Sequence, residues 1–344
     1  MSKQSNVLLV DGMALLFRGF FATSFRGNFM KNSKGVPTNG IYQFLRYFLD
    51  AVDKFEPTHV VCCWDMGSKT FRTELFDGYK ANRSAPPEEL IPQFDLIKEV
   101  AEAFNLPNIG LENFEADDCI GTLANQYASE NDVIILTGDQ DILQLVDDGI
   151  SVAIMKKGQG NYDVFSHETF YEKKGIRPKQ MIDLKGLMGD TSDNYPGVKG
   201  IGEKTALKLI QEYETIENIL DNIDRLPKGV QTKISENLDM LHLSRDLAEI
   251  RCDVPIECSL ERAKWSYDKK KIEEKFTDLE FNNLISVVEM QSMLCIFLFS
   301  VNKQICLPDA QPPPMRFCGH QGPYLTQTPS INHDICKIRA SVSG

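Results

Sequence analysis

The side chains best suited to chemistry in this chain are acidic residues that follow short hydrophobic runs. Runs rich in Val, Ile and Leu are followed by Asp11, by Asp65 and by the pair Asp139 and Asp141. Carboxylates repel one another, so a protein that gathers several of them usually holds divalent cations, and Mg2+ and Mn2+ prefer oxygen ligands. The repetition therefore predicts a site for Mg2+ or Mn2+.

Two further acidic clusters have the spacing to join such a site. Glu115, Asp117 and Asp118 open a segment with helical apolar spacing. Asp190 and Asp193 lie three residues apart, so one turn can present both to the same ion. A single acid at a strand end is commonly a turn or helix cap, and acids in a first helical turn are favoured by the helix dipole. Three acids in four positions exceed what capping needs, which favours a metal site.

The elements that must position these acids are those of an α/β fold with a mostly parallel central sheet flanked by helices. Residues 7–12, 59–65 and 133–141 are apolar on both alternating faces, as in strands that helices cover on both sides. Helical patterns separate these runs, an order typical of a parallel sheet. Ligands of such sheets bind beyond the carboxyl ends of the strands, where these acids fall.

Composition does not favour zinc, and it leaves nucleic acid open as a partner. The nine cysteines form no Cys-x-x-Cys pair and the five histidines are scattered. A net charge of -12 is unusual for a nucleic-acid binder, but bound cations offset part of an acidic cluster and a local basic face can still contact phosphate. Residues 1–12 lack a signal-peptide core, and the apolar run 293–301 is too short to span a membrane, so we expect a cytoplasmic protein.

Basic residues gather in the segment of about 68–95. Arg72, Lys80 and Arg83 are interleaved there with aromatic residues that include Tyr79. Cations that follow phosphates and rings that stack on bases suit single-stranded nucleic acid. A solvated amphipathic helix gives the same pattern, and the segment alone leaves both interpretations open.

Two other segments have the residues to contact phosphate. Arg18 follows Asp11 by about two helical turns, which is within reach of a phosphate near the metals. A glycine-rich turn at 197–202 precedes a new helix, so backbone N–H groups can face a phosphate at the helix N-terminus. Lysines around this turn favour a duplex-backbone contact over a plain connector. The residues concerned are Lys199, Gly200, Gly202, Lys204 and Thr205.

Together these motifs resemble the 5′-nuclease (flap endonuclease) superfamily, and most closely its bacterial 5′-3′ exonuclease form, standalone or at the amino terminus of DNA polymerase I. The resemblance rests on VDGMALLFR, the Trp-Asp pair at 64–65, FRTELFDGYKANR, EADD, TGDQD, GDTSDN and GVKGIGEKTA, in the family's order and spacing. It covers residues 6–284, and the set is far more specific than any one motif. It implies a prokaryotic, nucleoid-associated protein.

The resemblance also implies two metal sites made by nine carboxylates. The first would use Asp11, Asp65, Glu115, Asp117 and Asp118, and the second Asp139, Asp141, Asp190 and Asp193.

The family pattern gives roles to the basic residues as well. Lys80, Arg83 and Arg18 would lie near the scissile phosphate as catalytic residues. Tyr79 and Arg72 would contact a 5′ single strand that passes through a helical arch at about 68–95. The segment around Lys204 would form a helix-three-turn-helix that grips the duplex and can hold a K+ ion.

The residue types themselves indicate hydrolysis. No Ser-His or Cys-His arrangement is apparent, whereas two metals can activate a water and neutralise a leaving oxygen. We therefore expect a metal-dependent 5′-3′ exonuclease and 5′-flap endonuclease of replication and repair. Its substrate would be DNA with 5′ flaps or ends, or an RNA–DNA hybrid, and it would act as a monomer away from membranes. The alternatives are a PIN-like ribonuclease and a non-catalytic DNA-junction binding module.

We expect three regions along the chain. Residues 1–170 would form the metal-binding core, and 171–285 a helical DNA-binding region. Residues 286–344 do not match the family; a disordered extension and a frameshifted or joined reading frame would both look like this.

Overall fold

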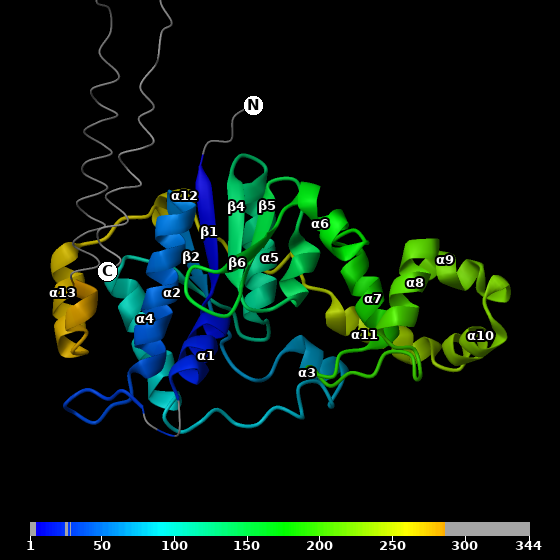
Figure 1. Cartoon of the computed structure of the whole chain (residues 1–344), viewed down its shortest axis with the longest axis horizontal. Helices are drawn as coiled ribbons and strands as arrows, with labels where there is room; N and C mark the ends of the chain where they lie inside the picture. The colour runs from blue at the N-terminus through cyan, green and yellow to red at the C-terminus, as the bar shows by residue number, and fades with distance from the viewer. Residues whose placement is uncertain (1–4, 25–26, 28, 286–344) are drawn as a thin grey trace, which may run out of the picture. The chain divides into compact units, whose positions relative to one another are not determined.

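A six-stranded sheet lies at the centre of the computed structural model, which describes residues 5–24, 27 and 29–285 (Figure 1). The strand order is β3-β2-β1-β4-β5-β6, and all neighbours are parallel except β5 and β6. The predicted mostly parallel α/β sheet is thus confirmed. The strands are β1 (Asn6–Asp11), β2 (His59–Cys63), β3 (Asn108–Ile109), β4 (Asp132–Thr137), β5 (Ile150–Met155) and β6 (Tyr162–Phe165).

The register of the central strands aligns their carboxyl ends. Asp11 in β1 lies opposite Cys63 in β2, and Val10 lies opposite Leu136 in β4. Because these three strands run in the same direction and end at the same level, the residues that follow them share one edge of the sheet.

Alternate residues of each strand are buried under different helices. Val7 and Leu9 of β1 pack in the core that contains α5, whereas Leu8 and Val10 pack in the core under α1, α2, α4 and α13. All four side chains are fully buried, and shortening one to alanine would cost about 2–5 kcal/mol. These helices are α1 (Gly12–Thr23), α2 (Asn39–Phe55), α4 (Ile91–Ala103), α5 (Ala116–Ala128) and α13 (Lys269–Asp278).

A second set of helices extends from the β6 side of the sheet (Figure 1). Leu187, Ile210 and Leu241 of this set belong to the same buried core as α5, so one core continues past residue 170. The helices are α6 (His167–Lys174), α7 (Gln180–Met188), α8 (Glu203–Tyr213), α9 (Ile216–Asp221), α10 (Lys228–Ser235) and α11 (Leu238–Ala248). The chain then returns to the sheet through α12 (Leu260–Ala263), where the Trp265 N–H donates to the Thr58 carbonyl at 2.8 Å.

The segment predicted as a helical arch, at about 68–95, is only partly helical in the structure. Within residues 68–95 the backbone is helical over α3 (Phe71–Leu75) and again from Ile91, where α4 begins, and residues 76–90 form turns and extended backbone. Turn-forming residues explain the difference: Gly78 and Asn82 favour turns, and Pro86 and Pro87 have no N–H group to continue a helix. We therefore call residues 71–90 the arch segment.

Within residues 5–24, 27 and 29–285, no helix is long and apolar enough to cross a bilayer. The expected atypical tail, 286–344, lies outside the described residues.

Candidate active site

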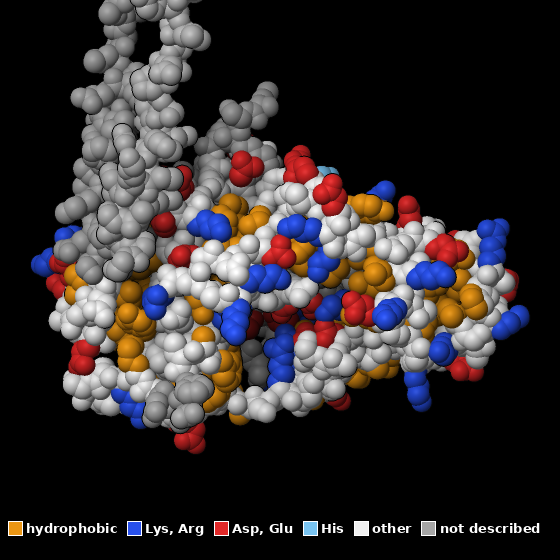
Figure 2. Space-filling model, viewed as in Figure 1, with side chains coloured by type: hydrophobic (Ala, Val, Ile, Leu, Met, Phe, Trp, Pro, Cys, Tyr) orange, Lys and Arg blue, Asp and Glu red, His pale blue; other side chains and the backbone are white. Residues whose placement is uncertain are grey.

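Acidic side chains from several elements meet at the carboxyl edge of the sheet. Asp11 is the last residue of β1, Asp65 follows β2 by two residues, and Asp139 follows β4 by two residues. Glu115 is the residue before α5, and Asp117 lies in the first turn of that helix. Figure 2 shows acidic side chains in a hollow near the middle of the view, with Lys and Arg side chains beside it.

Asp11 is buried and makes two hydrogen bonds. Its carboxylate caps α1 by accepting from the Ala14 N–H at 2.9 Å, and it accepts from the Thr137 hydroxyl at 2.6 Å. Burial raises the pKa of Asp11 to about 7, and the charges of Asp65 and Asp139 add to the rise, against the two hydrogen bonds. Asp11 is therefore a helix cap and also a member of a crowded acidic group.

Asp65 and Asp117 are crowded in the same way. Burial raises the pKa of Asp65, and the Glu115 charge adds to it, although the Ala116 N–H donates to this carboxylate at 2.7 Å. Burial raises the pKa of Asp117 well above its usual value, followed by repulsion from Asp11, Asp139 and Glu115. Crowded oxygen donors of this kind suit a hard divalent cation.

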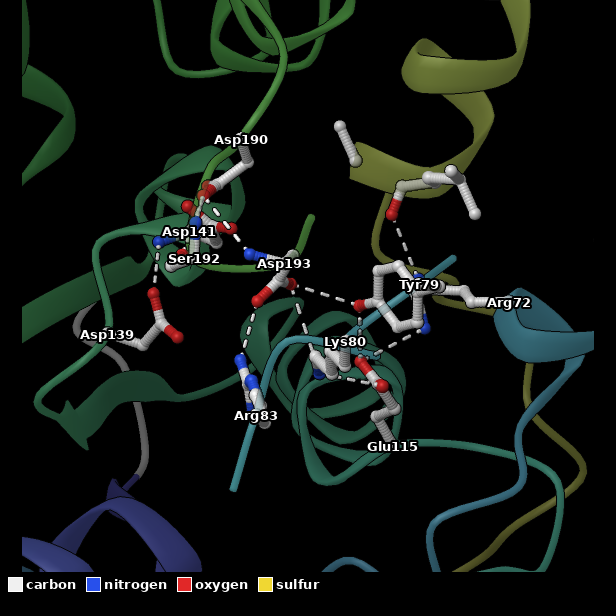
Figure 3. A network of polar contacts seen from close by, with 12 residues as sticks. Arg72, Tyr79, Lys80, Arg83, Glu115, Asp139, Asp141, Asp190, Ser192 and Asp193 are labelled. Atoms are coloured by element: carbon white, nitrogen blue, oxygen red, sulfur yellow. Dashed lines mark hydrogen bonds and ion pairs between the residues drawn. The ribbon is translucent and has the colours of Figure 1, made fainter. Parts of the chain in front are cut away.

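The arch segment places three polar side chains on this cluster (Figure 3). Lys80 Nζ lies 2.7 Å from Glu115 Oε1, and the Arg83 guanidinium lies 2.5 Å from Asp193 Oδ1. The buried Tyr79 hydroxyl lies 3.2 Å from Glu115 and 3.1 Å from Asp193. These contacts bring the arch segment and both predicted metal sites together.

A loop between α7 and α8 carries Asp190 and Asp193. Gly189 and Gly197 have positive φ angles of 73° and 61°, and a Cβ at Gly197 would lie 2.2 Å from the Gly189 nitrogen. Two glycines are therefore required for the loop to close, and Asp190 and Tyr195 pair across it.

A lysine that sequence reasoning missed bridges the second set of acids. Lys185 of α7 pairs with Asp141 at 2.6 Å and also with Asp190. Burial raises the pKa of Asp141 to about 6, with the Asp139 charge next, while Lys185 acts in the opposite direction. The sequence signal is slight: a lysine about one helical turn before the Asp190 loop. Within the described residues, no group of three or more Asp, Glu, His or Cys side chains is arranged to hold a metal ion. Lys80 and Lys185 instead pair with the acids.

Arg18 lines a cavity of about 740 Å3 together with Asp139, Asp141, Asp190 and Lys185. Its guanidinium donates to the Lys156 carbonyl, and its buried Nε has no partner in the described structure. The predicted catalytic arginine thus lies beside the second set of acids.

Arg72 and Asp118 occupy positions that differ from the prediction. Arg72 is only 2% exposed and Asp118 is fully buried, and the guanidinium bonds both carboxylate oxygens at 2.8 Å. A buried arginine whose donors are all engaged cannot contact DNA. The Asp118 carboxylate also accepts hydrogen bonds from the Glu115 and Arg251 N–H groups. We therefore correct the assignments of Arg72 as a DNA contact and of Asp118 as a metal ligand.

The residues predicted for duplex binding lie together on the surface at the start of α8. Gly202 is the residue before the helix, Gly200 has a φ of 83°, and its carbonyl accepts from Lys233 Nζ at 2.9 Å. The five residues are all exposed: Lys199, Gly200, Gly202, Lys204 and Thr205.

Comparison with family models matches most of the chain. The 5′-3′ exonuclease N-terminal resolvase-like domain matches residues 6–175, and the 5′-3′ exonuclease C-terminal SAM fold matches residues 176–271. The 5′-3′ exonuclease of Bacillus subtilis (strain 168) is 62% identical over 259 residues, which are 75% of this chain and 88% of that protein. DNA polymerase I of Bacillus caldotenax is 40% identical over 84% of this chain, which spans about a third of the polymerase (33%).

Solved structures with the same fold include nucleases. A bacteriophage T5 flap endonuclease complex with DNA and metal ions has a TM-score of 0.57 at 23% identity, covering 71% of this chain and 89% of that one. The catalytic core of Rad2 with DNA substrate has a TM-score of 0.54 at 16% identity, covering 80% and 87%. The family models, the 62% identity and the shared fold agree, and the chain belongs to the 5′-3′ exonuclease family.

Proposed function

We propose that this chain hydrolyses phosphodiester bonds in DNA, as a 5′-3′ exonuclease and 5′-flap endonuclease. The observation that carries the proposal is the contact of the arch segment with the acidic cluster, through Lys80 on Glu115 and Arg83 on Asp193. These two cations lie where they can stabilise negative charge on a phosphate brought to the carboxylates. A role in removing RNA primers and flaps during replication is consistent with the sequence identity to DNA polymerase I.

The carboxylates suit two Mg2+ or Mn2+ ions. Their donors are oxygens, and burial raises the pKa values of Asp11, Asp65 and Asp117, so the negative charge of each is unfavourable unless a cation compensates it. When bound, the two ions would lower the pKa of a water and neutralise charge on the leaving oxygen. We propose Asp11, Asp65, Glu115 and Asp117 for one ion, and Asp139, Asp141, Asp190 and Asp193 for the other.

The remaining roles follow from position. Tyr79 is buried, so instead of contacting a DNA strand, as the sequence predicted, it would orient Glu115 and Asp193 through its hydroxyl. Arg18 would hold a phosphate in the cavity beside Asp139. Duplex DNA would lie on the exposed turn around Lys204, where backbone carbonyls would also hold K+; the Gly200 carbonyl already accepts from a lysine ammonium.

Residues 1–170 would form the metal-binding core, and residues 171–285 would bind the duplex and also supply Asp190 and Asp193 to the second ion. We propose a monomer acting in the cytoplasm on 5′ flaps, 5′ ends or RNA–DNA hybrids.

The test compares cleavage and binding of a 5′-flap DNA with those of single-stranded RNA, in Mg2+ and in excess EDTA. We expect flap cleavage that requires metal. Asp65→Asn should nearly abolish it and leave flap binding in Ca2+ intact, and Asp193→Asn should recover more activity as Mg2+ is raised. Binding without cleavage would instead indicate a junction-binding module, and cleavage of RNA strands alone would indicate a ribonuclease.

A further inference from the structure

The buried pair of Arg72 and Asp118 uses every donor that the arginine has. The two forked contacts to Asp118 are each 2.8 Å, Nε donates to the Leu247 carbonyl at 3.0 Å, and the guanidinium also donates to the Glu249 carbonyl at 2.7 Å and to Glu115 at 3.5 Å. A guanidinium has five N–H groups, so all five are matched. Lysine, with three donors and no planar fork, cannot reproduce this arrangement.

These contacts tie together three elements that carry the active site. Arg72 is the second residue of α3, at the base of the arch segment, and Asp118 lies in the first turn of α5. Leu247 lies near the end of α11, and Glu249 is the residue directly after this helix. Figure 3 shows Arg72 beside Tyr79 and Glu115.

Asp118 also fixes the backbone of a proposed metal ligand. One of its oxygens accepts from the Glu115 N–H at 3.0 Å, and the other accepts from the Arg251 N–H at 2.9 Å. A change at Asp118 would therefore move Glu115 and, through it, the Lys80 and Tyr79 contacts of the arch segment.

Stability alone does not explain why such a pair is buried. Taking two charges out of water is costly, and apolar residues of similar volume often stabilise a fold as well or better. A fork with fixed geometry, in contrast, holds its elements at defined positions.

We infer that Arg72 and Asp118 are positioning residues, which hold the arch segment and the start of α5 in the arrangement that places Lys80 and Tyr79 on Glu115. The inference rests on the proposed nuclease function. It replaces direct roles in DNA contact and metal binding for these two residues.

Arg72→Lys and Asp118→Asn test this directly, with Arg245→Lys as the matched control. Arg245 also joins α11 to carboxylates, Asp183 at 2.7 Å and Glu217, and neither partner belongs to the arch segment. Misplacement by about 1 Å can cost 10²-fold in rate, so we expect single-turnover flap cleavage at saturating Mg2+ to fall by about 10²-fold in both variants. The flap dissociation constant in Ca2+ should stay within about threefold of wild type, and the Mg2+ midpoint should be the same in both variants, because both act through Glu115. The control should cleave like wild type.

Hydrogen exchange gives a readout that needs neither metal nor cleavage. The Lys80 N–H donates to the Asp193 carbonyl at 2.8 Å, and the Tyr79 N–H donates to the Phe76 carbonyl at 2.9 Å. Both amides should exchange faster in the two variants, while those of α8 do not change. Should either variant fail to fold, the double variant Arg72→Met with Asp118→Leu removes both charges and should show the same faster exchange.

Three results would overturn the inference. The first is wild-type cleavage by the variants, and the second is unchanged arch-segment exchange. The third is recovery of Asp118→Asn by raised Mg2+ with a midpoint shift that Arg72→Lys does not share, which marks a metal ligand. A wild-type protein that never cleaves flap DNA would instead overturn the proposed function, and the exchange result would still stand.

Discussion

Asp11 offers the sharpest test of the acidic cluster, because its two interpretations predict opposite effects on stability. As a helix cap it stabilises α1 through the Ala14 N–H, and loss of such a cap costs about 0.5–2 kcal/mol. As a buried acid among other acids, its pKa in the folded protein is about 7 against 3.8 for the free side chain, mainly because of burial. The folded state then holds this proton more tightly than the unfolded chain does.

The sign and size follow from that difference. The free energy of unfolding falls by about 4 kcal/mol as the pH rises from about 4 to about 7, and it is level above pH 7. This total corresponds to about 1.4 kcal/mol for each unit by which the pKa differs between the folded and unfolded states. Asp11→Asn cannot ionise, and its amide can still accept from the Ala14 N–H and donate to the Thr137 oxygen. In EDTA we therefore expect the variant to be more stable than wild type by about 4 kcal/mol at pH 8 and by about 2 kcal/mol at pH 5.

Urea denaturation at both pH values, with EDTA or Mg2+, measures these differences. Mg2+ at about 100 times its dissociation constant should add about 2.7 kcal/mol to wild type and much less to the variant. Asp95→Asn, at an exposed position of α4, is the control and should show neither effect. A variant less stable than wild type at pH 8 in EDTA would refute the reasoning, and Asp11 would be a helix cap alone.

Three further outcomes test other parts of the site. Lys80→Met should lower single-turnover cleavage by about 10²-fold with flap binding in Ca2+ little changed, and an equal loss of affinity would contradict its role at the phosphate. Lys204→Ala should reduce the salt dependence of duplex affinity by about one phosphate contact, measured by titration at several KCl concentrations, and leave the cleavage rate at saturating DNA unaltered. Gly197→Ala should destabilise the fold by about 2–3 kcal/mol and impair cleavage, because its Cβ would collide with the backbone of Gly189, whereas thermal unfolding of the control Gly229→Ala should show no loss of stability.

The central sheet was predictable because its signals are local and repeated. Runs apolar on both faces specify strands covered on both sides, and a parallel order fixes the edge at which the acids appear. The positions of Asp11, Asp65 and Asp139 follow from this without any knowledge of contacts. The glycine-rich turn predicted at 197–202 begins at Gly197, which in the structure closes the loop that carries Asp190 and has no room for a Cβ.

The arch segment was harder to predict because its conformation depends on long-range contacts. Alternating basic and aromatic residues fit a helix as well as a loop, and the local pattern does not decide between them. In the structure, Lys80 has a positive φ of 56° and its N–H bonds the Asp193 carbonyl, 113 residues later in the chain. Such a residue is determined by its partner and not by its neighbours.

Arg72 and Asp118 show why residue type alone does not separate a ligand from a support. Asp117 and Asp118 are adjacent and chemically identical, yet neighbouring positions on a helix point about 100° apart, so only one can face the acidic hollow. Asp117 is repelled by Asp11 and Asp139, whereas Asp118 bonds a guanidinium that arrives from α3. The arginine and the carboxylate are 46 residues apart, and their pairing could be read only from the fold. An acidic cluster in a sequence therefore sets an upper limit on the number of metal ligands, since some members are needed to hold the others in place.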